Sequence, residues 1–534
     1  MELTPRSRLG KKRPARALAF ALVLAAQVGC RTSAPAEAEA TEHAPAAPAP
    51  RPLGFSTLDD QVLYFAMVDR FADGDGATLE GTDPTNPLAY HGGDLRGLQQ
   101  RLPYLEDLGV TALWITPVYD QVDAPLGDER PFYGYHGYWA EDLTAVDPHF
   151  GDEAALSALI EEAHARGIRV VLDVVVNHLG YGARLAEDPA LVRSPALGTC
   201  PDDDEATEIN RCLFDLPDLR TEDPAVRARV LEWALSWVER FPLDGFRVDT
   251  LKHVEPELLT ELHQRAEALA EERHGVPSFL ALGEWWGAAP GDDDIDALVK
   301  SGAIDTAFDF SFTGLCEGFL SGRMRAEALA HHLEARERAE GPVLAPFLDN
   351  HDMTPLWHRL SAQRDRYPLA AVLLLTTRGM PVVSWGNELG REGGEFPDNR
   401  RPMPWERLES DEGRRLHDVF RALIHLRRAH PALSRGAFTT LVATTDAATK
   451  DATLAFLKGD PEADDEVFLV ALRRGRGVDL VLPGELLEGR TLAARFLAGH
   501  GPQTSGNTSA GRPDDRPGVV RVPDDGAGIW SLAR

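Results

Sequence analysis

The sequence predicts an α/β fold: a (β/α)8 TIM barrel with a small domain inserted after its third strand and a C-terminal antiparallel β-sandwich domain. Between residues 61 and 388, apolar runs of strand character alternate with amphipathic helical stretches, as parallel βα units require. Eight such runs can be counted, and eight units favour a closed barrel over an open sheet. Past Pro431 the helical pattern stops, and short β-type runs follow between Gly, Pro and Asp.

The eight expected barrel strands are short and apolar. In chain order they are residues 62–68, 112–116, 170–176, 245–248, 279–282, 308–312, 344–348 and 382–385. The segments between them, such as 153–166 and 256–272, carry apolar residues at helical spacing among charges. Because each strand is followed by such a segment, the carboxyl ends of the strands are expected on one rim of the barrel.

The connection after the third strand is much longer than the others, and its first part is rich in Pro, Asp and Gly. A connection of this length is normally functional or a small inserted domain. The expected β-type runs of the C-terminal domain are 453–457, 467–472, 478–482, 492–496, 519–522 and 529–532. The predicted domains are a barrel at 53–178 and 243–430, an inserted domain at 179–242 and a β-domain at 431–534.

Residues 1–30 have the order of a bacterial export signal. Six Lys and Arg residues precede the apolar run 17–26, and small residues lead to Cys30. The run is too short to span a bilayer as a permanent helix. Its end resembles a lipoprotein box, with Gln27 where that pattern usually has Leu. We therefore expect a lipid on Cys30, with cleavage without lipid as the alternative.

Residues 31–52 are mostly Ala, Pro and Glu, so they are expected to form a linker rather than a core. The expected location is the bacterial cell envelope, as a lipoprotein, or otherwise the periplasm or the medium. A disulfide between Cys200 and Cys212 would suit an exported protein. Cys316 follows an apolar residue and is expected to be a buried thiol.

The chain is strongly acidic, with 85 acidic residues, 55 basic residues and a formal charge of −30. Such a charge repels nucleic acid phosphates, so nucleic acid is not an expected partner. A neutral polymer is compatible with it.

Three carboxylates stand where an apolar run gives way to a loop: Asp249, Glu284 and Asp352. In a parallel barrel this rim carries the active site. Two acids about 5 Å apart are what retaining glycoside hydrolysis requires, one as nucleophile and one as acid and base. Each acid alone would also suit an ordinary ion pair, an exposed strand end or a loop cap.

Two neighbouring features favour unequal roles for these acids. Arg247, two residues before Asp249, is expected to orient that carboxylate and keep it ionised. Trp285 and Trp286 follow Glu284 directly, and an apolar setting would raise its pKa.

Five separated strings resemble motifs of the α-amylase superfamily of glycoside hydrolases, in the same order and with similar spacing. They are DVVVNH (173–178), LPDL (216–219), GFRVDTLKH (245–253), GEWW (283–286) and FLDNHD (347–352). GGDLRGL (92–98), YHGYW (135–139) and GMPVVSWGNE (379–388) extend the resemblance over nearly all of 55–430. It implies that Asp249 is the nucleophile, Glu284 the general acid/base and Asp352 the third carboxylate, which binds sugar hydroxyls.

The resemblance also implies residues that contact substrate. Aromatic faces suit sugars, because the pyranose ring has apolar C–H faces. Lone histidines would more often be structural. A Lys-His pair after the nucleophile is typical of α-amylases and cyclodextrin-forming relatives, with the Lys on the leaving-group side. The implied set is His136, Tyr138, His178, Arg247, Lys252, His253, Trp286 and His351.

Calcium is the cofactor that the resemblance implies, since it prefers hard oxygen ligands. One site would join the barrel to the inserted domain through Asn177, Asp218 and the carbonyls of His253 and Ile209. A second would use carboxylates of the strings at 69–76 and 92–94. Its ligands would be Asp73, Asp75 and Asp94. An Asp/Gly turn without an ion is the alternative there.

The expected function is retaining, α-amylase-like cleavage of α-1,4-glucosidic bonds in starch or maltooligosaccharides. The expected partner is the α-glucan, with the enzyme a monomer and membrane contact only through Cys30. Phe214 stands where cyclodextrin-forming relatives have an aromatic residue, so a cyclomaltodextrinase, maltogenic amylase or cyclodextrin-forming glucanotransferase is the alternative. Phe396 departs from relatives that often carry Asp at its position. A non-catalytic glycan-binding lipoprotein would lack one of the three acids, and none is missing.

Overall fold

The computed structural model describes residues 54–55, 57–127, 130–193, 209, 212–338, 341–500 and 518–534. The expected signal peptide and linker, with Cys30, lie outside these residues, and so does Cys200. Cys212 is disulfide-bonded. Cys316 is a buried free thiol, as expected from the sequence.

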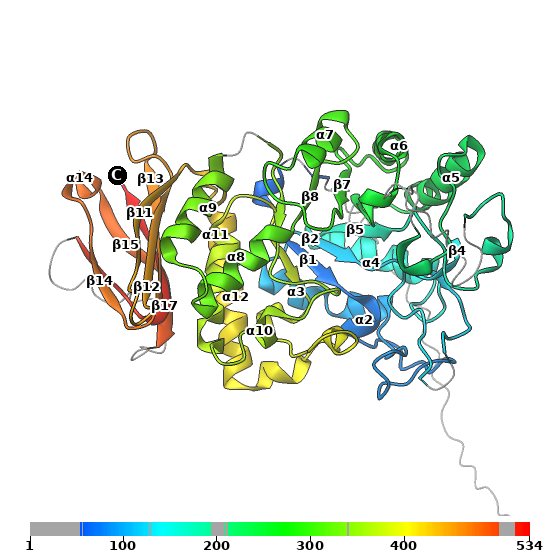
Figure 1. The fold of residues 1–534 in the computed structure, drawn as a ribbon, viewed down its shortest axis with the longest axis horizontal. Helices are drawn as coiled ribbons and strands as arrows, with labels where there is room; N and C mark the ends of the chain where they lie inside the picture. The colour runs from blue at the N-terminus through cyan, green and yellow to red at the C-terminus, as the bar shows by residue number, and fades with distance from the viewer. Residues whose placement is uncertain are drawn as a thin grey trace, which may run out of the picture. The chain divides into compact units, whose positions relative to one another are not determined.

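In the described residues, eight parallel strands form one sheet in the order β10-β1-β2-β5-β6-β7-β8-β9. A parallel bridge between Phe347 and Val382 joins the two edges of this sheet. The strands are β1 (Leu63–Ala66), β2 (Ala112–Ile115), β5 (Arg169–Val174), β6 (Gly245–Val248), β7 (Leu280–Gly283), β8 (Thr306–Asp309), β9 (Ala345–Pro346) and β10 (Val382–Ser384). With helices around these strands (Figure 1), the predicted (β/α)8 fold is confirmed.

The longer helices between and after these strands begin at polar caps and bury one apolar face. Asp152 accepts a hydrogen bond from the Ala155 amide at the start of α4, and Asp223 does the same for Ala225 in α5. The main helices are α2 (Leu95–Gln100), α3 (Leu102–Leu108), α4 (Glu153–Ala165), α5 (Pro224–Arg240), α6 (Pro256–His274), α7 (Asp293–Ser301), α8 (Phe310–Ser321), α9 (Ala326–Arg338), α11 (Tyr367–Thr376) and α12 (Asp411–Ala429). Within the described ranges, no helix combines the length and apolarity needed to span a membrane.

The expected strands 62–68 and 308–312 both run into a helix, since β1 ends at Ala66 and α1 (Val68–Phe71) follows it. The run 308–312 is not a strand throughout, because β8 ends at Asp309 and α8 begins at Phe310. The Asp309 carboxylate accepts hydrogen bonds from the amides of Ser311 (3.0 Å) and Phe312 (3.2 Å), which starts the helix there. A short apolar run does not separate strand from buried helix by periodicity, and this one contains both.

One feature near the active rim was not expected from the sequence. A hairpin of β3 (Tyr119–Gln121) and β4 (Ala140–Val146) extends between β2 and α4 and carries the loop with residues 135–139. After β5, the described part of the inserted segment is held by antiparallel bridges from His178 to Asp218 and from Val192 to Leu219. Its short helices are η2 (Arg184–Glu187) and η4 (Leu213–Asp215).

The C-terminal residues form antiparallel sheets, as predicted. In the described part, a five-stranded sheet has the order β11-β12-β13-β17-β15, and β14 pairs with β16 in a separate ribbon. The strands are β11 (Phe438–Thr445), β12 (Ala452–Lys458), β13 (Glu466–Arg474), β14 (Val478–Val481), β15 (Thr491–His500), β16 (Val519–Val522) and β17 (Asp524–Ala533). The sequence did not predict β11, which is rich in Thr and only partly buried.

Alternate residues of β13 serve two cores. Phe468 and Val470 join the main core, which includes the barrel. Leu469 and Ala471 point the other way and join a smaller core with residues of the β14–β16 ribbon. This alternation is the period of a strand. The five-stranded sheet is therefore covered on both faces.

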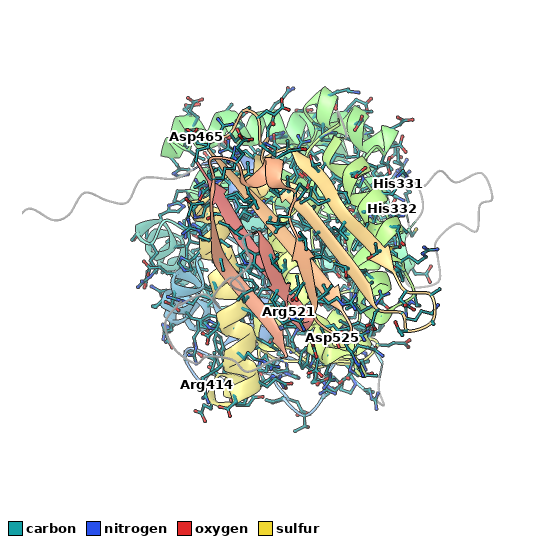
Figure 2. The ribbon with its side chains drawn as sticks, turned by 90° about the vertical axis from the view of Figure 1, so that its left-hand side faces the viewer. His331, His332, Arg414, Asp465, Arg521 and Asp525 are labelled. Atoms are coloured by element: carbon teal, nitrogen blue, oxygen red, sulfur yellow. The ribbon has the colours of Figure 1, made fainter. Side chains whose placement is uncertain are left out.

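Helices of the barrel pack against the first face of this sheet. Figure 2 faces the sheet and shows α9, marked by His331 and His332, to one side and α12, marked by Arg414, to the other. The Lys458 ammonium of β12, which is fully buried, lies 2.9 Å from the Glu337 carboxylate of α9. Removing one partner of such a buried pair costs about 3–5 kcal/mol, so this pair fixes the sheet on α9.

Candidate active site

Two of the three acids directly follow barrel strands, and Asp352 lies in the loop after β9. Asp249 follows β6 directly, and Glu284 follows β7 directly. The amide of Asp249 donates to the Val174 carbonyl (3.0 Å), and the amide of Glu284 donates to the Val248 carbonyl (3.0 Å). Each acid is thus tied to the neighbouring strand. Both side chains therefore belong to the same rim of the barrel.

The Arg247 guanidinium, 1% exposed, joins these carboxylates. Its Nη1 lies 2.6 Å from Asp249 Oδ1 and 2.9 Å from Asp173 Oδ1, and its Nη2 lies 3.0 Å from Glu284 Oε1. One cation among three buried carboxylates does not balance their charge. Either the net negative charge persists or one carboxylate keeps a proton.

Asp173 is a member of this cluster that sequence reasoning did not assign. Its Oδ2 accepts hydrogen bonds from the Tyr138 hydroxyl (2.7 Å) and the Trp114 indole (3.1 Å). The signal was available, because Asp173 is a charged residue within the otherwise apolar run 170–176. A fully buried charge needs partners, and those partners include Arg247.

The pKa values of the two central acids differ. Burial raises the pKa of Glu284 to about 8, with Arg247 opposing the shift and the nearby Asp249 and Asp352 adding to it. Burial also raises the pKa of Asp249 to about 6, against the opposing effect of Arg247. At neutral pH Glu284 therefore holds its proton while most Asp249 is ionised. The two acids are set for different tasks.

Two details differ from the sequence-based expectation. Arg247 does contact Asp249, but the net shift of the Asp249 pKa is upward, because burial outweighs the guanidinium. The Trp286 side chain is 53% exposed, and only Trp285 of the pair is partly buried. The raised pKa of Glu284 thus comes from its own burial at the rim rather than from enclosure by both indoles.

Asp352 is the most open of the three acids, with a side chain 33% exposed. Arg400 Nη2 donates to its Oδ1 (2.8 Å), and His351 Nε2 lies 3.2 Å from its Oδ2. Burial alone would raise the pKa of Asp352, but His351, Arg400 and Arg247 outweigh it and lower the pKa. Asp352 is therefore a carboxylate at neutral pH. Sequence reasoning did not assign Arg400.

The three expected histidines are buried, and His351 lies beside Asp352. Burial lowers the pKa of His351 to about 3 and that of His178 to about 4, and it also lowers the pKa of His136 well below its ordinary value. All three are neutral at pH 7 and can each donate and accept one hydrogen bond. His351 Nδ1 is buried and has no hydrogen-bond partner among the described residues. The Tyr138 and His351 rings are parallel, with centroids 5.3 Å apart.

Lys252 and Trp286 each contact an aromatic ring of a neighbouring segment. The Lys252 ammonium is 5.2 Å from the centre of the Trp285 ring, and Trp286 packs against Phe310 with centroids 4.8 Å apart. Thr250 has a φ of 49°, a strained conformation for a β-branched residue. Its amide points toward Glu284 Oε2 (3.4 Å), so the turn after Asp249 is held against the second acid.

Three of the four ligands expected at the first calcium site lie together. One terminal atom of the Asn177 amide is 2.7 Å from the His253 carbonyl and 3.1 Å from Asp218 Oδ1. With its oxygen there, Asn177 completes a set of three oxygens, which fits calcium. With its nitrogen there, it donates two hydrogen bonds instead. The Ile209 carbonyl, the fourth expected ligand, stays a prediction.

A cation of the protein already holds the other oxygen of Asp218. Arg193 Nε lies 2.6 Å from Asp218 Oδ2, and its guanidinium also pairs with Glu222. Arg193 thus joins two parts of the inserted segment, and Asp218 also lies beside Asn177, which follows β5. At this junction the Arg193 guanidinium contacts one oxygen of Asp218, while the other oxygen of Asp218 lies near Asn177 and the His253 carbonyl.

The three carboxylates expected at the second metal site also lie together. Carboxylate oxygens of Asp73, Asp75 and Asp94 all lie within 4.8 Å of one another, with Asp94 buried and the others exposed. Asp94 accepts hydrogen bonds from the amides of Gly97 (2.5 Å) and Gly74 (3.1 Å), so it also caps α2. The donor set fits a hard cation, and the turn is held by amides as well.

Comparisons with known proteins agree with this architecture. The family model described as "Alpha amylase, catalytic domain" matches residues 65–190 and 204–423. The curated relatives include a cyclomaltodextrinase of Geobacillus thermopakistaniensis, 28% identical over 83% of this chain and 74% of the relative. Neopullulanase 2 of Thermoactinomyces vulgaris is 30% identical over 71% of this chain and 64% of its own length. An α-amylase of Streptomyces lividans is 30% identical over 67% of this chain but 49% of its own length.

Two solved α-amylase structures each cover 90% of this chain. An Anoxybacillus α-amylase has a TM-score of 0.74 and 29% identity, covering 90% of this chain and 99% of its own. The α-amylase of Geobacillus thermoleovorans, solved with acarbose, has a TM-score of 0.71 and 27% identity, covering 90% of this chain and 100% of its own.

Proposed function

The chain belongs to the α-amylase family of glycoside hydrolases, and from this premise we propose that it cleaves α-1,4-glucosidic bonds in starch or maltooligosaccharides with retention of configuration. The observation that carries the proposal is the pair Asp249 and Glu284. Asp249 contacts Nη1 of Arg247 and Glu284 contacts its Nη2. The pKa is about 6 for Asp249 and about 8 for Glu284. An ionised acid beside a protonated one is the pair that retaining hydrolysis uses.

In the first step, an Asp249 oxygen forms a bond to the anomeric carbon while the bond from that carbon to the glycosidic oxygen breaks. The proton of Glu284 moves to the departing oxygen, so the leaving sugar departs as an alcohol. In the second step, the Glu284 carboxylate takes a proton from water. The water oxygen then bonds to the anomeric carbon and releases Asp249.

The surrounding residues would hold the reacting sugar. Asp352 is ionised and partly open, so it can accept hydrogen bonds from two hydroxyls of a distorted ring. His136, His178 and His351 are neutral and can donate to sugar oxygens. Tyr138 offers an aromatic face, with its hydroxyl fixed on Asp173. Lys252, His253 and Trp286 are proposed to act on the leaving-group side.

A second activity within the family is favoured by one observation. Phe214 is 80% exposed, and its carbonyl accepts a hydrogen bond from the Tyr181 hydroxyl (2.5 Å), which fixes the turn that presents it. An exposed aromatic ring in the inserted segment suits an acceptor sugar or a cyclic glucan. Chromatography of products from maltoheptaose and from a cyclodextrin distinguishes hydrolysis of linear chains from cyclodextrin cleavage and from glucan transfer.

Calcium is proposed as a structural cofactor. Asn177, Asp218 and the His253 carbonyl would hold one ion, and Asp73, Asp75 and Asp94 would hold another. When bound, calcium would supply positive charge that fixes loops beside the rim. The chemical steps above use only the side chains of the chain itself.

Export with a lipid on Cys30, and a monomeric state, are also part of the proposal. The order of the first 30 residues supports export, and the monomeric state stays a prediction. Mass spectrometry of the mature N-terminus, in wild type and Cys30→Ala, separates lipidation from simple cleavage.

The decisive test is Glu284→Gln assayed on soluble starch. Loss of a positioned general acid and base lowers kcat by about 10²- to 10⁴-fold. Glu485→Gln, an exposed Glu of α14 (Gly484–Leu487), is the matched control and should retain full activity. Wild-type turnover by Glu284→Gln would exclude the assigned role.

A further inference from the structure

Phe396 is a large apolar side chain that is 50% exposed and lies outside the groups assigned above. The loop that carries it is anchored at two places. The backbone amide of Gly394 donates to the Asp398 carboxylate (2.7 Å), and the side-chain amide of Asn399 donates to the His351 carbonyl (2.7 Å). The position of Phe396 is thus fixed relative to His351.

Arg400 connects Phe396 directly to the site. The centre of its guanidinium lies 5.0 Å from the Phe396 ring centre, within the range of a cation–π contact. The same guanidinium donates to Asp352 Oδ1 (2.8 Å) and to the His351 carbonyl (3.0 Å). Phe396 is therefore one side chain away from the third carboxylate.

A second path of contacts leads to the same ring. The ring centroids of Tyr138 and His136 are 5.8 Å apart, those of His136 and Phe132 are 5.6 Å apart, and those of Phe132 and Phe396 are 5.7 Å apart. His136 is buried, Phe132 and Tyr138 are half-buried, and Phe396 is the most open. The series runs outward from the acids to solvent.

A single exposed aromatic side chain is ordinary on a protein surface and needs no function. Phe396 differs because Phe132 and Arg400 hold its ring, while half of its surface stays open beside the catalytic rim. A flat ring that is already ordered loses little entropy when a sugar packs on it. The apolar C–H face of a pyranose matches such a ring.

We propose that Phe396 is a stacking platform for a glucose unit of the α-glucan beyond the unit held at Tyr138 and His136. This inference rests on the proposed function and adds a determinant of chain-length specificity. The Phe396 ring has no hydrogen-bonding group, so it selects for the presence of a further sugar ring rather than for its hydroxyl pattern. Chains too short to reach it gain nothing from it.

The test compares maltoheptaose with maltotriose. An aromatic contact of about 0.5–1.5 kcal/mol corresponds to roughly a two- to tenfold effect. Phe396→Ala should lower kcat/KM for maltoheptaose by that factor, mainly through KM, and leave maltotriose unchanged. Phe396→Trp should restore the wild-type ratio. Phe396→Leu keeps an apolar contact with Phe132 but lacks a flat face, so it should behave like Phe396→Ala.

Val481→Ala is the control, because Val481 is 77% exposed on β14 of the C-terminal domain. Calorimetric binding of both oligosaccharides to Glu284→Gln, with and without Phe396→Ala, measures the platform without turnover. Equal losses on both substrates, or no loss on either, would overturn the proposal. If wild type cleaves neither substrate, the proposed function fails, while the binding comparison still decides whether Phe396 holds a sugar.

Discussion

The Arg247 guanidinium lies 3.0 Å from Glu284 Oε1, yet the pKa of Glu284 is raised to about 8. A cation at that distance favours the ionised form of a carboxyl group. Burial of Glu284 and the neighbouring carboxylates outweigh it. Arg247 therefore orients the acid without removing its proton at neutral pH.

The pH dependence of kcat/KM should be bell-shaped. Activity requires ionised Asp249, whose pKa is raised to about 6, and protonated Glu284, whose pKa is raised to about 8. The rate should rise as pH increases through about 6 and fall as pH increases through about 8. Because Asp249 and Glu284 interact, each limb reports the titration of both acids together. Initial rates on maltoheptaose between pH 4 and 10 measure this. A profile that stays flat from pH 7 to 10 would contradict the protonation of Glu284.

Glu284→Gln should stabilise the protein at high pH. The folded pKa of Glu284 is about 8 and its ordinary value is 4.5, so the folded state binds a proton that the unfolded state lacks between these values. The free energy of unfolding therefore falls as pH rises through this window. The variant, which cannot ionise, should gain more than about 1 kcal/mol over wild type at pH 9 and much less at pH 4.5.

Urea unfolding at both pH values measures the difference. Glu485→Gln is the matched control, since Glu485 is exposed on α14. A stability gain that is equal at pH 4.5 and pH 9 would show that packing, and not the carboxyl proton, is responsible.

The barrel could be predicted because its strands are short apolar runs whose number and order define the fold. One exception, at 308–312, has a local cause: the run crosses from β8 into α8 at Asp309, which caps the helix through two backbone amides. Strand β11 was missed because its Thr-rich residues are partly exposed and lack a strong apolar pattern. An apolar pattern indicates which residues are buried, not whether they form a strand or a helix. The run 308–312 is apolar but contains both element types, and β11 is a strand without an apolar pattern.

The sequence predicted those site residues that stand in recognisable motifs. Asp249 and Glu284 are marked by their position directly after a strand, and Asp352 by the string FLDNHD (347–352). Asp173 and Arg400 gain their importance only in three dimensions, through contacts with Arg247 and Asp352. The order of the pKa values also depends on burial and on charges from separate strands, which one motif does not contain.

Asp173→Asn should change both stability and the acidic limb of activity. Asp173 is fully buried and pairs with Arg247, and removing one partner of such a pair costs about 3–5 kcal/mol. Its negative charge also raises the pKa of Asp249. Losing that charge should move the acidic limb of the kcat/KM profile to lower pH, by an amount that pH–rate measurements give directly.

Asp305→Asn, at a partly exposed carboxylate near His263, serves as a control for Asp173→Asn. It should leave the acidic limb unchanged. A shift of the acidic limb to higher pH in Asp173→Asn would mean that Asp173 acts on Asp249 mainly by holding Arg247 in place rather than by its own charge.

Calcium should raise the melting temperature of the chelated protein. Binding only to the folded state stabilises it by about 2.7 kcal/mol when the ion is at 100 times its Kd. Asp73→Asn should remove the part due to the exposed site, and Asn177→Asp, which adds a carboxylate beside Asp218 and the His253 carbonyl, should alter the part due to the junction. Scanning calorimetry with calcium, magnesium or chelator measures each part. If chelation changes nothing in any variant, Arg193 and the Asn177 amide close the junction by themselves, since together they contact both oxygens of Asp218.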